Sequence, residues 1–195
     1  MESFSQAGQD KFVLAILKNK IGGKYIEIGA NDPISISNTY SLERDYSWEG
    51  FSLDIVSDYV DKFNTVRKNK CVLADGSKFN YHEHIQNLWG DIDRIDYLQV
   101  DCEPAENTFK CLKTVPLDKY RFSVITFETE YYSSGENIRN ISREYLSDYG
   151  YVLVASDVHN VGNDPFEDWW VDSSFIDESI YKKYICENKK GKTIC

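Results

Sequence analysis

Short apolar segments alternate with amphipathic segments along most of the chain. Residues 25–29 form a β-rich run that is apolar on both faces except for Glu27, a pattern typical of a buried parallel strand. Residues 57–66 instead repeat their apolar positions every three or four residues, which predicts a helix capped by Ser57. Apolar runs predict further strands at residues 51–55, 71–74, 96–100, 122–127, 151–155 and near 169–171. Helical spacing predicts further helices near residues 12–17, 38–45, 104–112 and 138–146.

This alternation of strand and helix predicts a mostly parallel, doubly wound α/β sheet. Neither an internal repeat nor a Pro/Gly/Ser-rich linker divides the chain, so residues 1–195 are expected to form a single domain. Pro104 suits the first turn of the helix near residues 104–112. Ligands of such sheets bind outside the carboxyl ends of the strands, where the strand order reverses. The residues that directly follow each strand are therefore the first candidates for a binding site.

Gly29 ends the first predicted strand and allows the chain to turn tightly beneath a ligand. A dinucleotide-binding loop has the pattern G-x-G-x-x-G, but Asn31 and Ile34 occupy the second and third glycine positions here. This departure argues against a clamp for a pyrophosphate and leaves room for a nucleoside without phosphates. Taken alone, Gly29 is explained equally well as a turn glycine.

Acidic residues follow nearly every predicted strand, on the same edge of the sheet. Asp54 is placed to accept hydrogen bonds from both hydroxyl groups of a ribose, and Asp75 or a neighbouring backbone amide to contact an adenine amino group. Each acid alone is a weak signal in an acidic protein, and helix capping accounts for some, such as Glu103. Their joint occurrence is a stronger signal. The other acids at these positions are Asp101, Glu106, Glu128, Glu130 and Asp157.

The charge of the chain narrows the class of ligand. The 195 residues include 22 Lys and Arg against 32 Asp and Glu, a formal net charge of −10. Binding to nucleic-acid phosphates or to anionic membranes requires an excess of basic residues, so neither partner is expected. A ring of carboxylates instead suits a cofactor with ribose hydroxyls, an adenine and a positive charge. S-adenosylmethionine has all three and no phosphate.

Cysteine and targeting signals indicate a soluble, cytoplasmic protein. The cysteines form no CxxC pair, so neither a zinc ribbon nor a thioredoxin motif is expected. The first residues lack the pattern of a signal peptide, and no apolar run approaches the roughly 20 residues of a membrane helix. His82 and His84 suggest a metal, but a solvated helix or loop face is the favoured interpretation, and no metal site is expected. The cysteines are Cys71, Cys102, Cys111, Cys186 and Cys195.

Several short motifs resemble the FkbM family of S-adenosylmethionine-dependent methyltransferases, and they keep the family's order over most of the chain. The resemblance implies the class I methyltransferase fold, a Rossmann-like three-layer sandwich whose seven-stranded sheet is mostly parallel with the last strand antiparallel. It also implies methyl transfer to a hydroxyl group of a sugar, glycolipid or polyketide product. The matching segments are SQAGQD (residues 5–10), YIEIGAND (25–32), SNT (37–39), LE (42–43), WEG (48–50), IDYLQVDCE (95–103) and ITFE (125–128).

The resemblance also implies roles for individual residues. Two positions near the expected acceptor depart from the family: Pro104 stands where the family usually has Gly, and Thr129 where it often has His. Cofactor contacts are expected from Glu27, Gly29, Ala30, Asn31, Asn38, Asp54, Ile55, Asp75, Gly76 and Asp101. Acceptor contacts are expected from Gln6, Gln9, Asp10, Tyr131 and Trp169.

Asp101 is the first candidate for the base that receives the hydroxyl proton, followed by Glu128 and Glu103 and then His159. Asp101 alternatively holds the amino group of the methionine part, and His159 is alternatively an ordinary loop histidine. The three acids offer the oxygen ligands that Mg²⁺ prefers. Because the cofactor and base roles already account for these acids, activity without a metal is expected.

Residues 166–170 (FEDWW) combine aromatic rings and acids, which suits the apolar face and hydroxyl rim of a sugar on a glycan or glycoconjugate. The alternative is that Trp169, Trp170 or both pack against the sheet. Two other functions stay open: a nicotinamide-dependent oxidoreductase, which the missing glycines disfavour, and a non-catalytic interaction module, which the strand-end acids disfavour. The net charge disfavours a nucleic-acid methyltransferase. A monomer and a homodimer are both compatible with the sequence.

Overall fold

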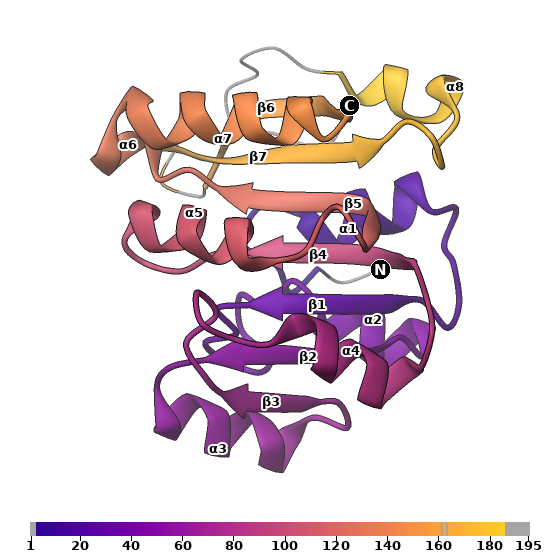
Figure 1. Cartoon of the computed structure of the whole chain (residues 1–195), viewed down its shortest axis with the longest axis vertical. Coiled ribbons are helices and arrows are strands. Elements are labelled where there is room, and N and C mark those ends of the chain that lie inside the picture. Colours follow the sequence, from indigo (N-terminus) through magenta and orange to yellow (C-terminus); the bar gives the residue numbers. More distant parts are fainter. Residues whose placement is uncertain (1–2, 161, 163, 186–195) are drawn as a thin grey trace.

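Within the described residues, 3–160, 162 and 164–185, seven strands form one sheet in the order β3-β2-β1-β4-β5-β7-β6 of this computed structural model (Figure 1). Each strand that the sequence predicted is present, with some differences in its ends. The strands are β1 (Lys24–Ile28), β2 (Glu49–Asp54), β3 (Lys70–Leu73), β4 (Arg94–Val100), β5 (Arg121–Glu128), β6 (Tyr151–His159) and β7 (Pro165–Asp172).

The sheet is parallel except at β7. β1 lies between β2 and β4, and β3 and β5 extend the parallel part outward. β7 pairs antiparallel with both β5 and β6, so β6 runs in the same direction as β5. This arrangement confirms the predicted sheet with an antiparallel last strand. The strand order reverses between β1 and β4, and that reversal is the place where a doubly wound sheet binds its ligand.

Helices cover both faces of the sheet and make a three-layer sandwich (Figure 1). Side chains of α4, α5 and α7 pack into the core on one face, and those of α1, α2 and α8 pack into the core on the other. α3 lies beside β2 and β3. The helices are α1 (Gln9–Ile16), α2 (Tyr40–Tyr46), α3 (Ser57–Val66), α4 (Tyr81–Trp89), α5 (Ala105–Thr114), α6 (Tyr131–Ser134), α7 (Glu136–Asp148), α8 (Glu178–Tyr181) and the 3₁₀ helix η1 (Lys182–Tyr184).

The helix α4 was not predicted from the sequence, because only Tyr81 and Ile85 on it are fully buried and the remaining positions are mostly polar. Its beginning nevertheless carries a cap: the Oδ1 atom of Asn80 accepts a hydrogen bond from the backbone N–H of Glu83 (3.2 Å). His82 and His84 lie on this helix, as the solvated-face interpretation allows. A ring nitrogen of His82 lies 2.6 Å from the hydroxyl of Tyr120.

Two helix starts differ from the predictions. Ser57 is the first residue of α3 and makes no capping hydrogen bond, and Asp54 instead accepts a hydrogen bond from the backbone N–H of Val56 (2.8 Å). Pro104 precedes α5 with an extended backbone and is not part of its first turn. The N-cap residues are therefore Val56 for α3 and Pro104 for α5.

The aromatic side chains of residues 166–170 on β7 lie in the hydrophobic core and not on the surface. Trp170 is 1% exposed and packs with the helices of one face, and Trp169 is 4% exposed and packs on Phe12 of α1 on the other face. Alternation along a strand puts neighbouring side chains on opposite faces, and here both faces are covered. The expectation that this segment presents exposed aromatic rings is therefore wrong, and the alternative that both tryptophans pack against the sheet is correct.

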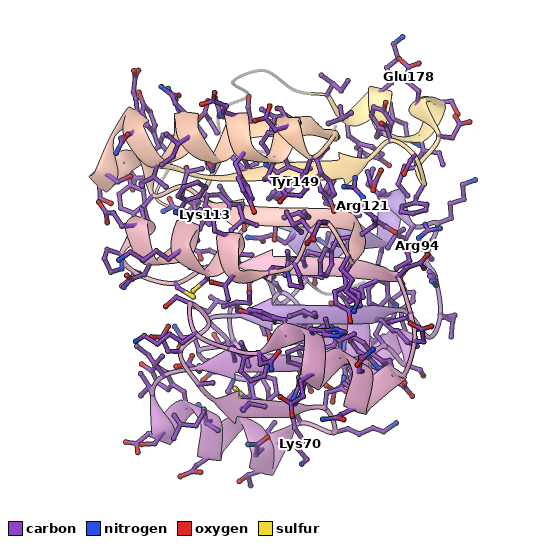
Figure 2. All side chains as sticks on the ribbon, in the orientation of Figure 1. Lys70, Arg94, Lys113, Arg121, Tyr149 and Glu178 are labelled. Atoms are coloured by element: carbon purple, nitrogen blue, oxygen red, sulfur yellow. The ribbon has the colours of Figure 1, made fainter. Side chains whose placement is uncertain are left out.

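Arg121 forms hydrogen bonds that connect β7 in the antiparallel part of the sheet to the end of α7. Its Nε atom donates to Asp172 at the end of β7 (2.7 Å), and its Nη1 atom donates to the backbone carbonyl of Tyr149 after α7 (2.8 Å). Figure 2 shows Arg121 and Tyr149 close together at the end of the sheet away from the strands' carboxyl ends. In the described part of the chain, none of the helices is both long and apolar enough to cross a membrane.

Candidate functional site

A cleft of about 700 Å³ opens at the carboxyl ends of β1 to β5, the edge at which their arrowheads end in Figure 1. It lies at the reversal in strand order between β1 and β4, as predicted for a doubly wound sheet. The structure brings many of the predicted site residues together around it. The predicted residues that line the cleft are Gln6, Gly29, Asn31, Asp54, Ile55, Asp75, Gly76, Asp101, Glu103 and Glu128.

Gly29 allows β1 and β4 to approach closely at the floor of the cleft. Its φ of 88° lies in the left-handed region, and a Cβ atom on it would lie 1.6 Å from the backbone carbonyl oxygen of Asp101. The backbone N–H of Asp101 in turn donates to the carbonyl of Ile28 (2.9 Å). Only glycine can stand at this position without displacing the loop that follows β4.

Asp54 organises the loops that follow β1 and β2. Its Oδ2 atom accepts a hydrogen bond from the backbone N–H of Asn31 (2.9 Å), and its Oδ1 atom accepts one from Val56 (2.8 Å). An ionised carboxylate has about four lone-pair positions, so each oxygen of Asp54 retains the capacity to accept one more hydrogen bond. Because Asp54 also lines the cleft, that capacity is available to a ligand with two neighbouring hydroxyl groups.

Asp75, after β3, is held in a tight turn. Its carboxylate accepts hydrogen bonds from the backbone N–H and hydroxyl of Ser77 (2.9 and 2.7 Å) and from the Nζ atom of Lys78 (2.7 Å). The hydrogen bond from Lys78, followed by those from Ser77, lowers the pKa of Asp75 to about 2. Gly76 follows, and a Cβ atom there would lie 2.7 Å from the side chain of Ile28. The backbone of this turn therefore packs directly against β1.

Asp101 and Glu128 form a carboxyl pair at the cleft. Their side chains share a hydrogen bond, which requires one proton between the two groups. Glu128 is 6% exposed, and its burial, together with the hydrogen bond and the negative charge of Asp101, raises its pKa far above the usual range of a carboxylic acid. Burial also raises the pKa of Asp101. The pair thus shares one proton, and the raised pKa of Asp101 favours the uptake of a second.

The acid Glu27, expected to contact the cofactor, is part of a buried network and does not line the cleft. Its carboxylate accepts hydrogen bonds from the hydroxyl of Ser52 (2.6 Å) and from that of Thr39 (3.0 Å). Burial raises the pKa of Glu27 to about 7, although the positive charge of Arg67 and these hydrogen bonds act in the opposite direction. Glu27 therefore connects β1, β2 and the start of α2.

Four other predicted site residues are also buried. Gln9 and Asp10 begin α1, and Asp10 accepts hydrogen bonds from the hydroxyls of Ser3, Ser5 and Ser41. Ala30 packs with α3 in a small core cluster. Asn38 is 6% exposed, and its Oδ1 atom has no hydrogen-bond partner among the described residues. None of these four side chains lines the cleft.

Three further predictions fall away from the cleft. Trp169 is buried in the core. Tyr131 begins α6, and its ring contacts the guanidinium of Arg139 at 3.9 Å. His159 ends β6 opposite Pro165 of β7. None of the three is among the residues that line the cleft. Tyr132, one position after Tyr131, does line it and is 49% exposed.

The sequence analysis missed several residues of the cleft wall. Ile36, Tyr59 and Tyr132 offer partly exposed apolar surface, and Cys102 and Cys111 contribute two free thiols. Tyr59 belongs to the apolar repeat that predicted α3, but that repeat indicates a core position and not a cleft position. The direction of the other four side chains depends on tertiary contacts, so no local pattern predicts that they line the cleft. Cys186 and Cys195 lie outside the described residues.

A metal centre finds no support in the described part of the chain, where no group of three or more His, Cys, Asp or Glu side chains is arranged to hold an ion. His82 and His84 therefore belong to no such group. The expected absence of a metal site stays a prediction, which chelation tests directly.

Neither a known protein-family model nor a curated protein sequence matches this chain. Solved structures do resemble it. One is a candidate rRNA methylase from Clostridium thermocellum (TM-score 0.59, 10% identity, 88% of this chain and 97% of that one). Another is the fibrillarin of Aeropyrum pernix, solved with bound S-adenosyl-L-methionine (TM-score 0.52, 14% identity, 83% and 74%). A third is the N-methyltransferase NodS from Bradyrhizobium japonicum (TM-score 0.52, 9% identity, 84% and 94%). The fold of this chain is that of the class I methyltransferases.

Proposed function

We propose that this protein is an S-adenosylmethionine-dependent methyltransferase that methylates a hydroxyl group of a sugar, on a glycan or glycoconjugate. The observation that carries the proposal is the convergence of Gly29, Asp54 and the Asp101–Glu128 pair on one cleft at the strand reversal of this fold. The likeness to solved methyltransferases supports the cofactor, and the resemblance of the motifs to the FkbM family supports the hydroxyl acceptor.

The residues of the cleft suit this cofactor. Asp54 has acceptor capacity for both ribose hydroxyls, and the neighbouring side chain of Ile55, 71% exposed, offers an apolar surface to an adenine ring. Gly29 keeps side-chain atoms away from the floor, where the nucleoside and the methionine part would meet. Five acids and two lysines, Lys78 and Lys110, line the cleft, and this excess of acids favours a cation over phosphates and so disfavours a dinucleotide.

When bound, S-adenosylmethionine supplies a methyl group that is already activated by the sulfonium charge. The protein then has two tasks. It must hold the acceptor hydroxyl in line with the methyl group, and such positioning contributes up to about 7–11 kcal/mol in favourable cases. It must also receive the hydroxyl proton, and a positioned base typically contributes about 10²–10⁴-fold. The Asp101–Glu128 pair is suited to the second task because burial raises both pKa values.

The acceptor side of the cleft is consistent with a sugar. Tyr132 and Glu103 line the cleft, and both are exposed. An exposed aromatic ring packs well on the apolar face of a pyranose, and carboxylates accept hydrogen bonds from its hydroxyl groups. Tyr132 therefore replaces Trp169 and Tyr131 as the proposed aromatic contact.

Calorimetry with S-adenosylhomocysteine and, separately, with NADH tests the cofactor. We expect saturable binding of S-adenosylhomocysteine and none of NADH. Binding of NADH alone would support an oxidoreductase, and binding of neither would support an interaction module. A screen of mono- and oligosaccharides with a methyl-labelled donor then tests the acceptor. Label that is transferred only to amines or to RNA would contradict the proposed acceptor while leaving the cofactor assignment intact.

A further inference from the structure

The loop between β1 and α2 has an unusual backbone at the cleft. Ile36 has a φ of 56°, in the left-handed region. This conformation is a genuine outlier for a β-branched residue, because Cβ approaches the following carbonyl group. The side chain of Ile36 is 51% exposed and lines the cleft. The loop therefore stores strain at the residue that it presents to a ligand.

Arg67 clamps this loop on both sides of Ile36. It directly follows α3, and its side chain is only 3% exposed. A guanidinium has five N–H donors in a fixed plane, and here they meet five different acceptors. The acceptors are Glu43 Oε2 (2.9 Å from Nε), the Pro33 carbonyl (2.9 Å) and Ser37 Oγ (3.3 Å) from Nη1, and Tyr25 Oη (3.2 Å) and Thr39 Oγ1 (3.1 Å) from Nη2.

Other contacts fix the same segment. Asp32 accepts hydrogen bonds from the backbone N–H groups of Ile34 and Ser35 (2.9 and 2.8 Å) and pairs with Lys62 of α3 (2.5 Å). Ser5 forms an isolated parallel bridge to Ile36, next to Gln6, which also lines the cleft. The surroundings thus over-determine the conformation of Ile36, and strain that persists under such conditions typically marks a functional position.

We infer that Ile36 is a contact residue for the cofactor in the cleft and that Arg67 is its positioning residue. The strained backbone directs the isoleucine side chain into the cleft, and the five hydrogen bonds of Arg67 hold the loop in that conformation. This inference rests on the proposed function, because S-adenosylhomocysteine is the ligand used to test it.

Two substitutions at Ile36 distinguish the effect of its backbone strain on stability from the effect of its side chain on cofactor binding. Ile36→Gly removes the Cβ atom and should raise Tm by about 2–4 °C, since glycine adopts a positive φ without strain. Ile36→Ala retains Cβ and should not raise Tm. Both should weaken binding of S-adenosylhomocysteine about tenfold, because both remove the apolar contact. Ile21→Gly is the matched control: Ile21 is exposed, lies outside the cleft and has no positive φ, so Tm should not rise and binding should not change.

A double-mutant cycle tests Arg67. Arg67→Lys keeps the positive charge, but an ammonium group has three N–H donors for the five acceptors around Arg67. The substitution should weaken binding of S-adenosylhomocysteine about tenfold. In an Ile36→Ala background the same change should cost less than about threefold, because the contact that Arg67 positions is already gone. Arg44→Lys, the same exchange at an exposed arginine, serves as the control.

The outcomes decide the inference. It is overturned if wild-type protein binds S-adenosylhomocysteine and the Ile36 variants bind it equally well. The role of Arg67 is overturned if the effects of Arg67→Lys and Ile36→Ala on the free energy of binding S-adenosylhomocysteine are additive. Additivity would indicate that Arg67 has a general structural role. A Tm of Ile36→Gly below that of the wild-type protein would contradict the backbone strain at Ile36. Wild-type protein that fails to bind S-adenosylhomocysteine overturns the proposed function and this inference together.

Discussion

The carboxyl groups of Asp101, after β4, and Glu128, at the end of β5, share one hydrogen bond at the cleft. Two carboxylates cannot make this contact while both are ionised, so the contact requires one proton shared between the two groups. Because Val100 and Phe127 pair in the parallel sheet, the two acids follow from the register of β4 and β5. The register of the strands thereby places the proposed base.

Replacing one member of the pair should affect turnover more than cofactor binding. We expect Asp101→Asn to lower kcat by about 10²–10⁴-fold, since the amide cannot receive the acceptor proton. The affinity for S-adenosylhomocysteine should change by less than about threefold. Steady-state kinetics and calorimetry measure the two effects, with the exposed Asp118→Asn as control. Equal losses in both would reassign Asp101 to holding the cofactor.

Gly29 should tolerate no side chain. The Cβ atom of Gly29→Ala would meet the Asp101 carbonyl at 1.6 Å, so we expect a loss of more than about 4 kcal/mol in the free energy of unfolding. Gly22→Ala is the control, because Gly22 also has a positive φ but no atom within 4 Å of the added Cβ. It should cost only about 1–2 kcal/mol. Denaturant unfolding compares the two variants, and similar losses would show that conformation alone explains Gly29.

Asp54→Ala should weaken cofactor binding. The substitution removes a charged acceptor for the ribose and leaves the backbone N–H groups of Asn31 and Val56 without their partner. We expect the Kd for S-adenosylhomocysteine to rise about 10- to 100-fold. Asp58→Ala, at an exposed acid four positions later on α3, should leave the Kd unchanged. An Asp54→Ala protein with wild-type affinity would remove Asp54 from the proposed site.

Glu27 should make stability depend on pH. Its pKa is raised to about 7 in the folded protein, mainly by burial, against 4.5 for an ordinary glutamate. A group with a raised pKa favours the folded state below pH 4.5 and loses that contribution as the pH rises through 7. The neutral Glu27→Gln variant should therefore gain about 3 kcal/mol relative to wild type between pH 4.5 and pH 8. Unfolding at both pH values measures this, and a constant difference would show that Glu27 is ionised throughout.

Chelation should not reduce activity. The described acids form no metal-binding group, and the proposed mechanism gives each of them another role. We expect methyl transfer to continue at the same rate in EDTA. Loss of turnover that Mg²⁺ restores would mean that the acids around Asp101 hold a metal during the reaction.

The fold was predictable because its signals are local. The apolar run of residues 25–29 is a buried parallel strand in the structure, and the acids after it converge because parallel strands end on the same edge. The missed features depend on distant contacts. Arg67 meets partners 24 to 42 residues away, and nothing in the local sequence sets Ile36 apart. Aromatic acceptor contacts were predicted at Tyr131 and Trp169, but neither lines the cleft, whereas Tyr132 does, since neighbouring residues of a short helix point in different directions.

The shared proton of Asp101 and Glu128 has a consequence for turnover. On the proposed function, the donor enters with one positive charge and meets a pair that carries one negative charge while Asp101 is ionised. Methyl transfer removes the positive charge from the cofactor, and the proton taken from the acceptor removes the negative charge from the pair. Both partners become neutral in the same step, so the attraction between them contributes to binding of the donor and not to binding of the product. The donor is therefore held more tightly than S-adenosylhomocysteine, whose binding rests on the other contacts of the cleft, and deprotonation of the pair readies it for the next donor.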